Sequence, residues 1–176
     1  MEFAGKIRTN RARINRTGTV VALMAASGLL GLMALPTTVE AAMGPFTALA
    51  GSWSGGGTIT MSSGARERIR CRARYNVGGA GSSVALTLRC ASDSYNFELQ
   101  SNASHNNGAV SGTWAELTRQ VGGNIEGSAR GNRINVRVSG VISAVLAVST
   151  SANSQSISIQ APGTEMRHVA ISLSRK

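Results

Sequence analysis

From Gly51 onward, apolar and polar residues alternate with a period of two, and Gly, Asn, Ser and Asp break the alternation at short intervals. This pattern is typical of half-buried β-strands joined by tight turns. It is clearest in segment 66–75, where every even position is Arg and apolar residues occupy the odd positions from Ile69 to Tyr75. Because successive strand side chains point to opposite faces, we expect five arginines on one face and the apolar residues on the other.

The alternating segment that follows forms a hairpin with 66–75 if the chain turns at Ala80-Gly81. The apolar faces of the two strands then match, and Cys71 lies directly opposite Cys90. Directly opposed strand residues have Cα atoms ~4.5–5.5 Å apart, within the ~4.4–6.8 Å that a disulfide spans. The pattern therefore predicts a structural disulfide. A redox role is not expected, because the two residues do not form a Cys-x-x-Cys motif.

Matching of apolar faces predicts three further hairpins. Their turns and opposed residues are Ser92-Asp93 with Cys90 opposite Tyr95 and Leu88 opposite Phe97, Gly131-Asn132 with Ile125 opposite Val138, and Ser151-Ala152 with Leu146 opposite Ile157. Additional strands near 53–61, 110–117 and 166–173 bring the expected total to about ten.

The predicted fold class is all-β, with about ten antiparallel strands in an up-and-down barrel of the lipocalin or avidin type. Closing the sheet into a barrel removes the exposed edge strands that an open sheet would have. A β-sandwich is the alternative, and we favour the barrel because short hairpin loops suit a meander better than Greek-key crossings. No internal linker interrupts the pattern, so residues 42–176 are expected to form a single β-barrel domain.

Residues 1–41 have the pattern of a secretory signal peptide. Five basic residues within 1–16 precede an apolar stretch at 20–35, and small residues stand at positions −3 and −1 of a cleavage site before Ala42. The alternative is an uncleaved N-terminal anchor, but the apolar stretch is shorter than the ~20 residues needed to cross a bilayer. We therefore expect a periplasmic or secreted protein that meets a membrane peripherally or through the uncleaved segment.

The charge balance narrows the class of partner. The chain has 18 Lys and Arg against 8 Asp and Glu, a formal net charge of +10. Without residues 1–41 the charge is +7, from 13 basic and six acidic residues. A basic chain invites an interpretation as a nucleic-acid binder, but an exported protein meets little nucleic acid. We expect an anionic envelope component or a small ligand as the partner, and no nucleic acid.

The candidate anion-binding residues are the outward arginines of 66–74 and the arginine opposite Arg72 on the next strand. They are Arg66, Arg68, Arg70, Arg72, Arg74 and Arg89. Guanidinium forks suit carboxylate and phosphate oxygens. Like charges directly opposed across a sheet are destabilising. Binding of an anion would explain why these arginines lie together. The alternative is that these charges keep a solvated face soluble and protect strand edges from aggregation.

The large aromatic residues are expected to fill the core and barrel ends, or to line a cavity for a small hydrophobic ligand. These cavity candidates are Trp53, Tyr75, Tyr95, Phe97 and Trp114. Catalysis, a cofactor and a metal are not expected, because the sequence has two histidines, no Gly-x-Ser-x-Gly elbow and no zinc-ligand spacing. The interpretation is a non-catalytic, exported binding module of the cell envelope, with a carrier of a small hydrophobic ligand as the alternative.

Four segments resemble an uncharacterised family of small exported proteins of Gram-negative bacteria. They are Leu49-Ala50-Gly51-Ser52-Trp53, Arg70-Cys71-Arg72, residues 88–95 and residues 111–114. The likeness implies export and implies no particular activity.

Segment 51–57 also matches the Gly-x-Trp-x-Gly-x-Gly motif of nitrobindin-like barrels, which are related to lipocalins (calycins). The resemblance implies a ten-stranded barrel in which Trp53 plugs one end and the glycines let the first strand bend. It also implies haem binding through a histidine on the last strand, for which His168 is the candidate. However, Val169 and Leu173 belong to the expected inward face of that strand, and this turns His168 outward.

Overall fold

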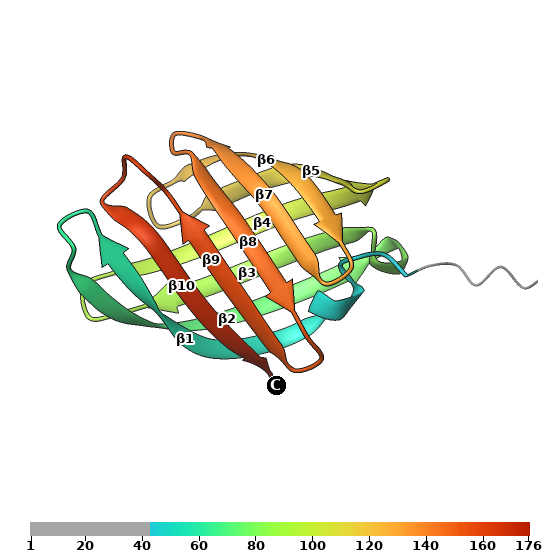
Figure 1. The fold of residues 1–176 in the computed structure, drawn as a ribbon, viewed down its shortest axis with the longest axis horizontal. Helices are drawn as coiled ribbons and strands as arrows, with labels where there is room; N and C mark the ends of the chain where they lie inside the picture. Colours follow the sequence, from blue (N-terminus) through green and yellow to red (C-terminus); the bar gives the residue numbers. More distant parts are fainter. Residues whose placement is uncertain (1–42) are drawn as a thin grey trace, which may run out of the picture. The chain divides into compact units, whose positions relative to one another are not determined.

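The computed structural model describes residues 43–176, and the predicted signal peptide at 1–41 lies outside them. The described chain forms ten antiparallel strands closed into a barrel, which confirms the predicted barrel over the sandwich (Figure 1). The strands are β1 (Gly51–Met61), β2 (Arg66–Gly78), β3 (Ser83–Ala91), β4 (Asn96–Asn106), β5 (Ala109–Glu116), β6 (Val121–Arg130), β7 (Arg133–Gly140), β8 (Ala144–Thr150), β9 (Ser154–Gln160) and β10 (Met166–Arg175). Two short 3-10 turns are η1 (Thr47–Leu49) and η2 (Gly79–Gly81). Neither turn is long and apolar enough to cross a membrane.

Each strand pairs with its neighbours in sequence, and β10 returns to pair with β1. The closing seam runs from Trp53 opposite Arg175 to Met61 opposite Met166, with one irregularity of register between Thr60 and Met61. Because the ring is complete, no strand of the barrel leaves a free row of backbone donors and acceptors.

Two of the predicted hairpin registers are confirmed. In the β2–β3 hairpin Cys71 lies opposite Cys90, and in the β6–β7 hairpin Ile125 lies opposite Val138. In both, apolar residues on the inward face of one strand meet apolar residues of the next. The register follows from the sequence because slipping by one residue would turn the whole apolar set outward.

The other two predicted registers are wrong by two residues. Cys90 lies opposite Phe97 rather than Tyr95, and Leu146 lies opposite Ile159 rather than Ile157. The connecting loops are longer than two residues, and serine side chains form hydrogen bonds within them. In the β3–β4 loop the Ser92 hydroxyl accepts a hydrogen bond from the Tyr95 N–H at 2.9 Å and donates one to the Tyr95 carbonyl at 3.2 Å. A shift of two keeps the side-chain parity, so the apolar faces still point inward.

The barrel interior is one hydrophobic cluster to which all ten strands contribute alternate side chains. The largest side chains that are almost completely buried are Trp53, Phe46, Ile59, Ile171, Leu173 and Cys71. Burial of this apolar surface is the main force that holds the sheet closed.

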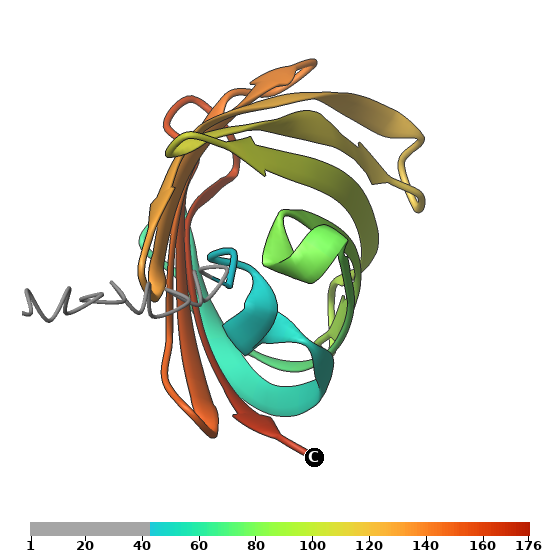
Figure 2. The ribbon, with the colours of Figure 1, turned by 90° about the vertical axis from the view of Figure 1, so that its right-hand side faces the viewer.

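One mouth of the barrel, where η1 and η2 lie, faces the viewer in Figure 2. Phe46 and Leu49, which flank and end η1, are 1% and 3% exposed. The Trp53 indole N–H donates to the Leu49 carbonyl at 2.7 Å. The Arg175 guanidinium carbon lies over the Trp53 ring, 4.3 Å from its centroid, and the same guanidinium donates a hydrogen bond to the Ala48 carbonyl. Trp53 therefore closes this end, as its motif predicts.

The glycines of β1 are required by a close approach between strands. A Cβ atom on Gly55 would lie 2.0 Å from the Ser172 carbonyl oxygen, and one on Gly57 would lie 2.1 Å from that of Ala170. Both oxygens belong to β10, so these glycines let β1 bend tightly against the last strand. The closing seam thus depends on the absence of side chains at these two positions.

Candidate anion-binding face

The outer face of β2 carries the five predicted arginines, and all five are exposed. The alternate residues Ile69, Cys71, Ala73 and Tyr75 are buried, none more than 6% exposed. Because this inward set is part of the core, β2 cannot slip or turn over without exposing it. Core packing therefore holds the arginines on the outer face.

Small and uncharged residues lie opposite these arginines on β1. Across β1 the five arginines lie opposite Ser52, Ser54, Gly56, Thr58 and Thr60. Across β3, Arg72 lies opposite Arg89 and Arg74 lies opposite Thr87. We call the six residues Arg66, Arg68, Arg70, Arg72, Arg74 and Arg89 the arginine face. None of the five on β2 has a carboxylate directly opposite it on either neighbouring strand.

The arginine face is hollowed around Arg70, Arg72 and Arg89 into a depression of about 660 Å³. Its lining also includes Ser54, Asn96, Phe97, Glu98, Thr118 and Lys176. Most of the lining comes from the adjacent strands β1 to β4 and includes the outward arginines, so the depression lies on the outside of the barrel. Three arginines therefore contribute to the lining of one concave surface.

Carboxylates neutralise little of this charge. Within residues 43–176 the ion pairs are Arg89 with Glu98 at 2.9 Å and Arg119 with Glu116 at 3.5 Å. The hydrogen bond that Arg89 donates to Glu98 raises the pKa of the Arg89 guanidinium. The Arg89 side chain is still 69% exposed. The five arginines of β2 form no ion pair within the described residues, which leaves their donors available to a ligand.

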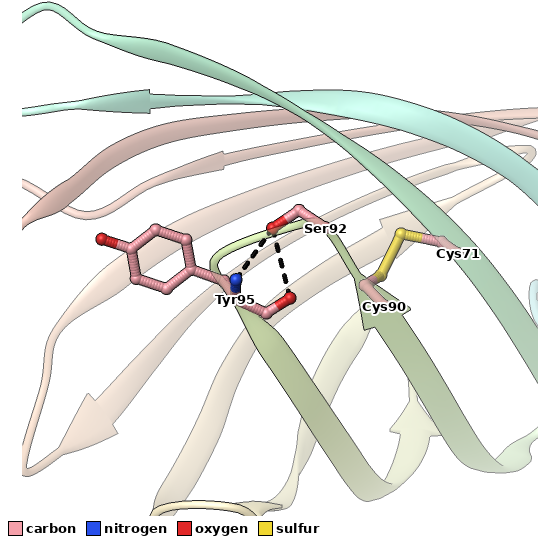
Figure 3. The surroundings of a disulfide bond; sticks show 4 residues. All are labelled: Cys71, Cys90, Ser92 and Tyr95. Carbon is pink, nitrogen blue, oxygen red and sulfur yellow. Dashed lines mark hydrogen bonds between the residues drawn. A yellow bond between two sulfur atoms is a disulfide. The ribbon is translucent and has the colours of Figure 1, made fainter.

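The predicted disulfide is present and joins β2 to β3 (Figure 3). Cys71 and Cys90 have Cα atoms 4.1 Å apart, and both residues contribute to the lining. They alternate with Arg70, Arg72 and Arg89 along β2 and β3. The covalent link therefore fixes the two strands to each other at the point where three like charges come together.

A second depression, of about 440 Å³, lies further along the same outer surface. It is lined by residues of β2 to β5 that carry no charge, among them Asn76, Ser83, Asn102, Ser104 and Ser111. Sequence reasoning did not predict this depression. Its signal was weak, because isolated Asn and Ser residues at outward strand positions are common on any solvated sheet.

The aromatic cavity candidates Trp53, Tyr75 and Trp114 are packed within the core. Tyr75 donates its hydroxyl to Gln155 Oε1 at 2.8 Å, and the Trp114 indole donates to the Ser139 carbonyl at 3.2 Å. Burial raises the pKa of the Tyr75 hydroxyl, and the bond to Gln155 offsets part of this. These polar groups are satisfied by the protein itself. A ligand cavity inside the barrel remains a prediction.

The last two aromatic candidates are separated by the register shift of the β3–β4 hairpin. Phe97 is half-buried on the inward face, opposite Cys90. Tyr95 lies in the loop and not on a strand, and its ring points away from the disulfide (Figure 3). The prediction that Tyr95 lines the interior opposite Cys90 is therefore wrong, because the loop takes up two more residues than a tight turn.

His168 lies on the outer face of β10, between Thr60 and Gln160 of the adjacent strands. Its Nε2 is 3.2 Å from the Ser158 hydroxyl. The inward positions beside it are held by Val169 and Ile171, at 6% and 2% exposure. Haem binding through His168 inside the barrel is therefore not supported by its orientation. Within the described residues, no three His, Cys, Asp or Glu side chains gather as they would to hold a metal ion.

Glu116 is a structurally important residue that the sequence did not reveal. It is 8% exposed at the end of β5, and its carboxylate accepts hydrogen bonds from the backbone N–H groups of Glu98, Thr118 and Arg119. Burial raises the pKa of Glu116, but the hydrogen bonds from Thr118, Arg119 and Glu98 outweigh it, so the pKa lies below its ordinary value. A carboxylate that ends a strand has no distinctive sequence pattern.

The chain matches no known family model, and it matches no curated protein in sequence. Among solved structures, it is similar to Rv2717c from M. tuberculosis, with a TM-score of 0.59 over 74% of this chain and 94% of that chain. The sequence identity is 14%, so the similarity concerns the fold alone. The chain shares a closed barrel architecture with that protein, and the arginine face has to be interpreted from its own residues.

Proposed function

We propose that this protein is an exported, non-catalytic binding module of the cell envelope, and that its arginine face binds an anionic partner. The observation that carries this proposal is the depression lined by Arg70, Arg72 and Arg89, in which the Glu98 side chain pairs with Arg89 and leaves Arg70 and Arg72 without an ion pair in the described chain. Guanidinium donors bind carboxylate and phosphate oxygens in bidentate geometry. A concave group of such donors is therefore suited to an anion.

The disulfide supports an oxidising, non-cytoplasmic location, because such bonds persist mainly in exported proteins. The signal-peptide pattern of residues 1–41 and the resemblance to exported Gram-negative proteins support the more specific assignment to the periplasm or the exterior. In that compartment the available anionic partners are phosphorylated or carboxylated envelope components rather than nucleic acid.

The competing explanation is that the arginines only keep the outer sheet soluble. Solubility requires exposed charge, but it does not require like charges to face each other across a sheet as Arg72 and Arg89 do. Nor does it require a depression lined by them. An anion bound there would relieve the repulsion, and this gives the arrangement a physical reason.

Charge reversal at Arg68, Arg70 and Arg72, with linear inorganic polyphosphate as the probe, tests the proposal. The matched control reverses Arg130, Arg133 and Arg167, which are also exposed and lie on other strands. Both triple variants change the net charge by the same amount. We expect reversal on the arginine face to weaken binding about tenfold or more, equivalent to ~1.4 kcal/mol, and the control to change it less than about twofold.

Polyphosphate binding measured at a series of salt concentrations supplies an independent readout. Binding by exposed guanidinium groups weakens steeply as salt rises, because the Debye length falls to ~8 Å at physiological ionic strength. Equal weakening by the two triple variants would show that only net charge matters. Absence of binding by the wild-type protein would remove the anion-binding proposal altogether.

A further inference from the structure

We propose that the anionic partner is an acidic polysaccharide, whose charged groups bind the arginine face while its hydroxyl groups bind the neighbouring uncharged depression. This inference rests on the proposed function and specifies the ligand class. It is carried by the position of the two depressions on one continuous outer surface, both formed by residues of β2, β3 and β4.

The charged part of the surface has a regular spacing. Alternate residues along a strand are separated by about 6.6–6.8 Å, so the five arginines from Arg66 to Arg74 form a row about 27 Å long. A row of this length matches a linear chain with repeating anionic groups better than a single small anion. The small residues of β1 opposite the row, such as Ser54 and Gly56, leave room beside it.

The uncharged part offers amide and hydroxyl groups with free hydrogen-bonding capacity. Asn76, Asn102, Ser104 and Ser111 line the second depression. Within residues 43–176 their side chains make no hydrogen bond to the protein, whereas those of Ser92 and Ser151 do. Amides and hydroxyls both donate and accept, which suits the hydroxyl groups of a sugar.

Outward residues connect the two depressions without a break. Arg74 lies opposite Thr87 on β3, and Thr87 lies opposite Gln100 on β4. Arg74 and Asn76 are adjacent outward positions of β2, one on each side of the boundary. A chain molecule can therefore contact guanidinium groups at one end and amide groups at the other while it follows a single surface.

The surface lacks what other polyanions would need. Single-stranded nucleic acid is usually bound by stacking bases on aromatic rings, and the outward positions of β2, β3 and β4 carry no aromatic residue. A bilayer surface is usually bound with the help of inserted apolar side chains. Among the described residues, the exposed large hydrophobic side chains are Met43, Leu117, Val141, Ile142 and Val145, and none belongs to β2, β3 or β4.

The experiment compares a polyuronate oligosaccharide with linear polyphosphate of the same number of charges, since the second probe has no hydroxyl-bearing sugar. One variant, Asn76→Ala with Asn102→Ala, alters only the uncharged depression. Its matched control, Asn132→Ala with Asn135→Ala, removes two exposed amides elsewhere on the barrel. A third variant, Arg70→Gln with Arg72→Gln, removes charge from the first depression. Thermal unfolding of each variant confirms that the barrel is intact.

We expect the Asn76/Asn102 variant to weaken polyuronate binding about fivefold or more and to leave polyphosphate binding within about twofold. The Arg70/Arg72 variant should weaken both, and the Asn132/Asn135 control neither. If the Asn76/Asn102 variant affects both probes equally or neither, the polysaccharide inference fails while anion binding stands. Stronger binding to phosphatidylglycerol vesicles than to polyuronate would assign the face to a lipid surface. Binding to no probe would refute both proposals.

Discussion

Reduction of the Cys71–Cys90 disulfide should lower the free energy of unfolding by about 3 kcal/mol. The two cysteines are 19 residues apart in sequence, and closing a loop of that size removes this much conformational free energy from the unfolded chain. The native barrel already holds the two strands in register through backbone pairing on both sides of the bond. The effect is therefore expected to act through the unfolded state, with little change in the folded structure.

Urea unfolding of oxidised and fully reduced protein measures this difference. Both cysteines are buried, at 2% and 3% exposure, so the reductant has to be applied to the unfolded chain before refolding. The double variant Cys71→Ala, Cys90→Ala is the control, because its stability cannot depend on the reductant. Thiol titration of the denatured oxidised protein should find essentially no free thiol. Equal free energies of unfolding for the oxidised and reduced wild type would refute the reasoning.

Two further predictions concern residues that hold the barrel together. The depressed pKa of Glu116 means that its ionised form stabilises the fold at neutral pH, and this contribution is lost as pH falls through the folded-state pKa. The Glu116→Gln variant should therefore be about 1–3 kcal/mol less stable than the wild type at neutral pH, as measured by urea unfolding. Its free energy of unfolding should also fall less steeply as the pH is lowered. Equal pH dependence in the variant and the wild type would contradict this role. Gly57→Ala should destabilise by about 3 kcal/mol or more, because its Cβ would lie 2.1 Å from the Ala170 carbonyl. Gly64→Ala is the control, because Gly64 has a φ of +88° but open space where a Cβ would lie, and it should lower the stability by only about 1 kcal/mol. Thermal unfolding measures both variants. Similar losses of stability would show that the predicted clash at Gly57 does not occur.

The sequence alone was sufficient for the features that depend on local alternation. The period-two pattern of 66–75 determines which side of β2 faces the core, and it identifies the arginines as outward. The match between the two apolar faces of the first hairpin determines that Cys71 meets Cys90. Both inferences succeed because side-chain direction in a strand repeats every two residues and a register error of one would bury charge.

Loop length was less accessible to sequence reasoning. The β3–β4 and β8–β9 connections are longer than the tight turns expected, so Tyr95 occupies a loop and Phe97 takes its place opposite Cys90. The Ser92 side chain forms two hydrogen bonds with the Tyr95 backbone in this loop, and hydrogen bonds of this kind favour particular turns. The alternation of inward and outward residues does not reveal the loop length, because a shift of two residues leaves the alternation unchanged.

Only the tertiary structure decided where the arginines gather and what surrounds them. The pairing of β1 with β10 brings the two ends of the domain together, and the bend at Gly55 and Gly57 shapes the sheet there. The depressions are lined by several strands at once, and the lining of the first includes small residues far apart in sequence, such as Ser54 and Ala91. Alternation specifies one strand at a time, whereas a concave surface is a property of several strands packed together. The sequence therefore predicted the charged row, and the packing of β1 to β4 determined that part of it lines a depression.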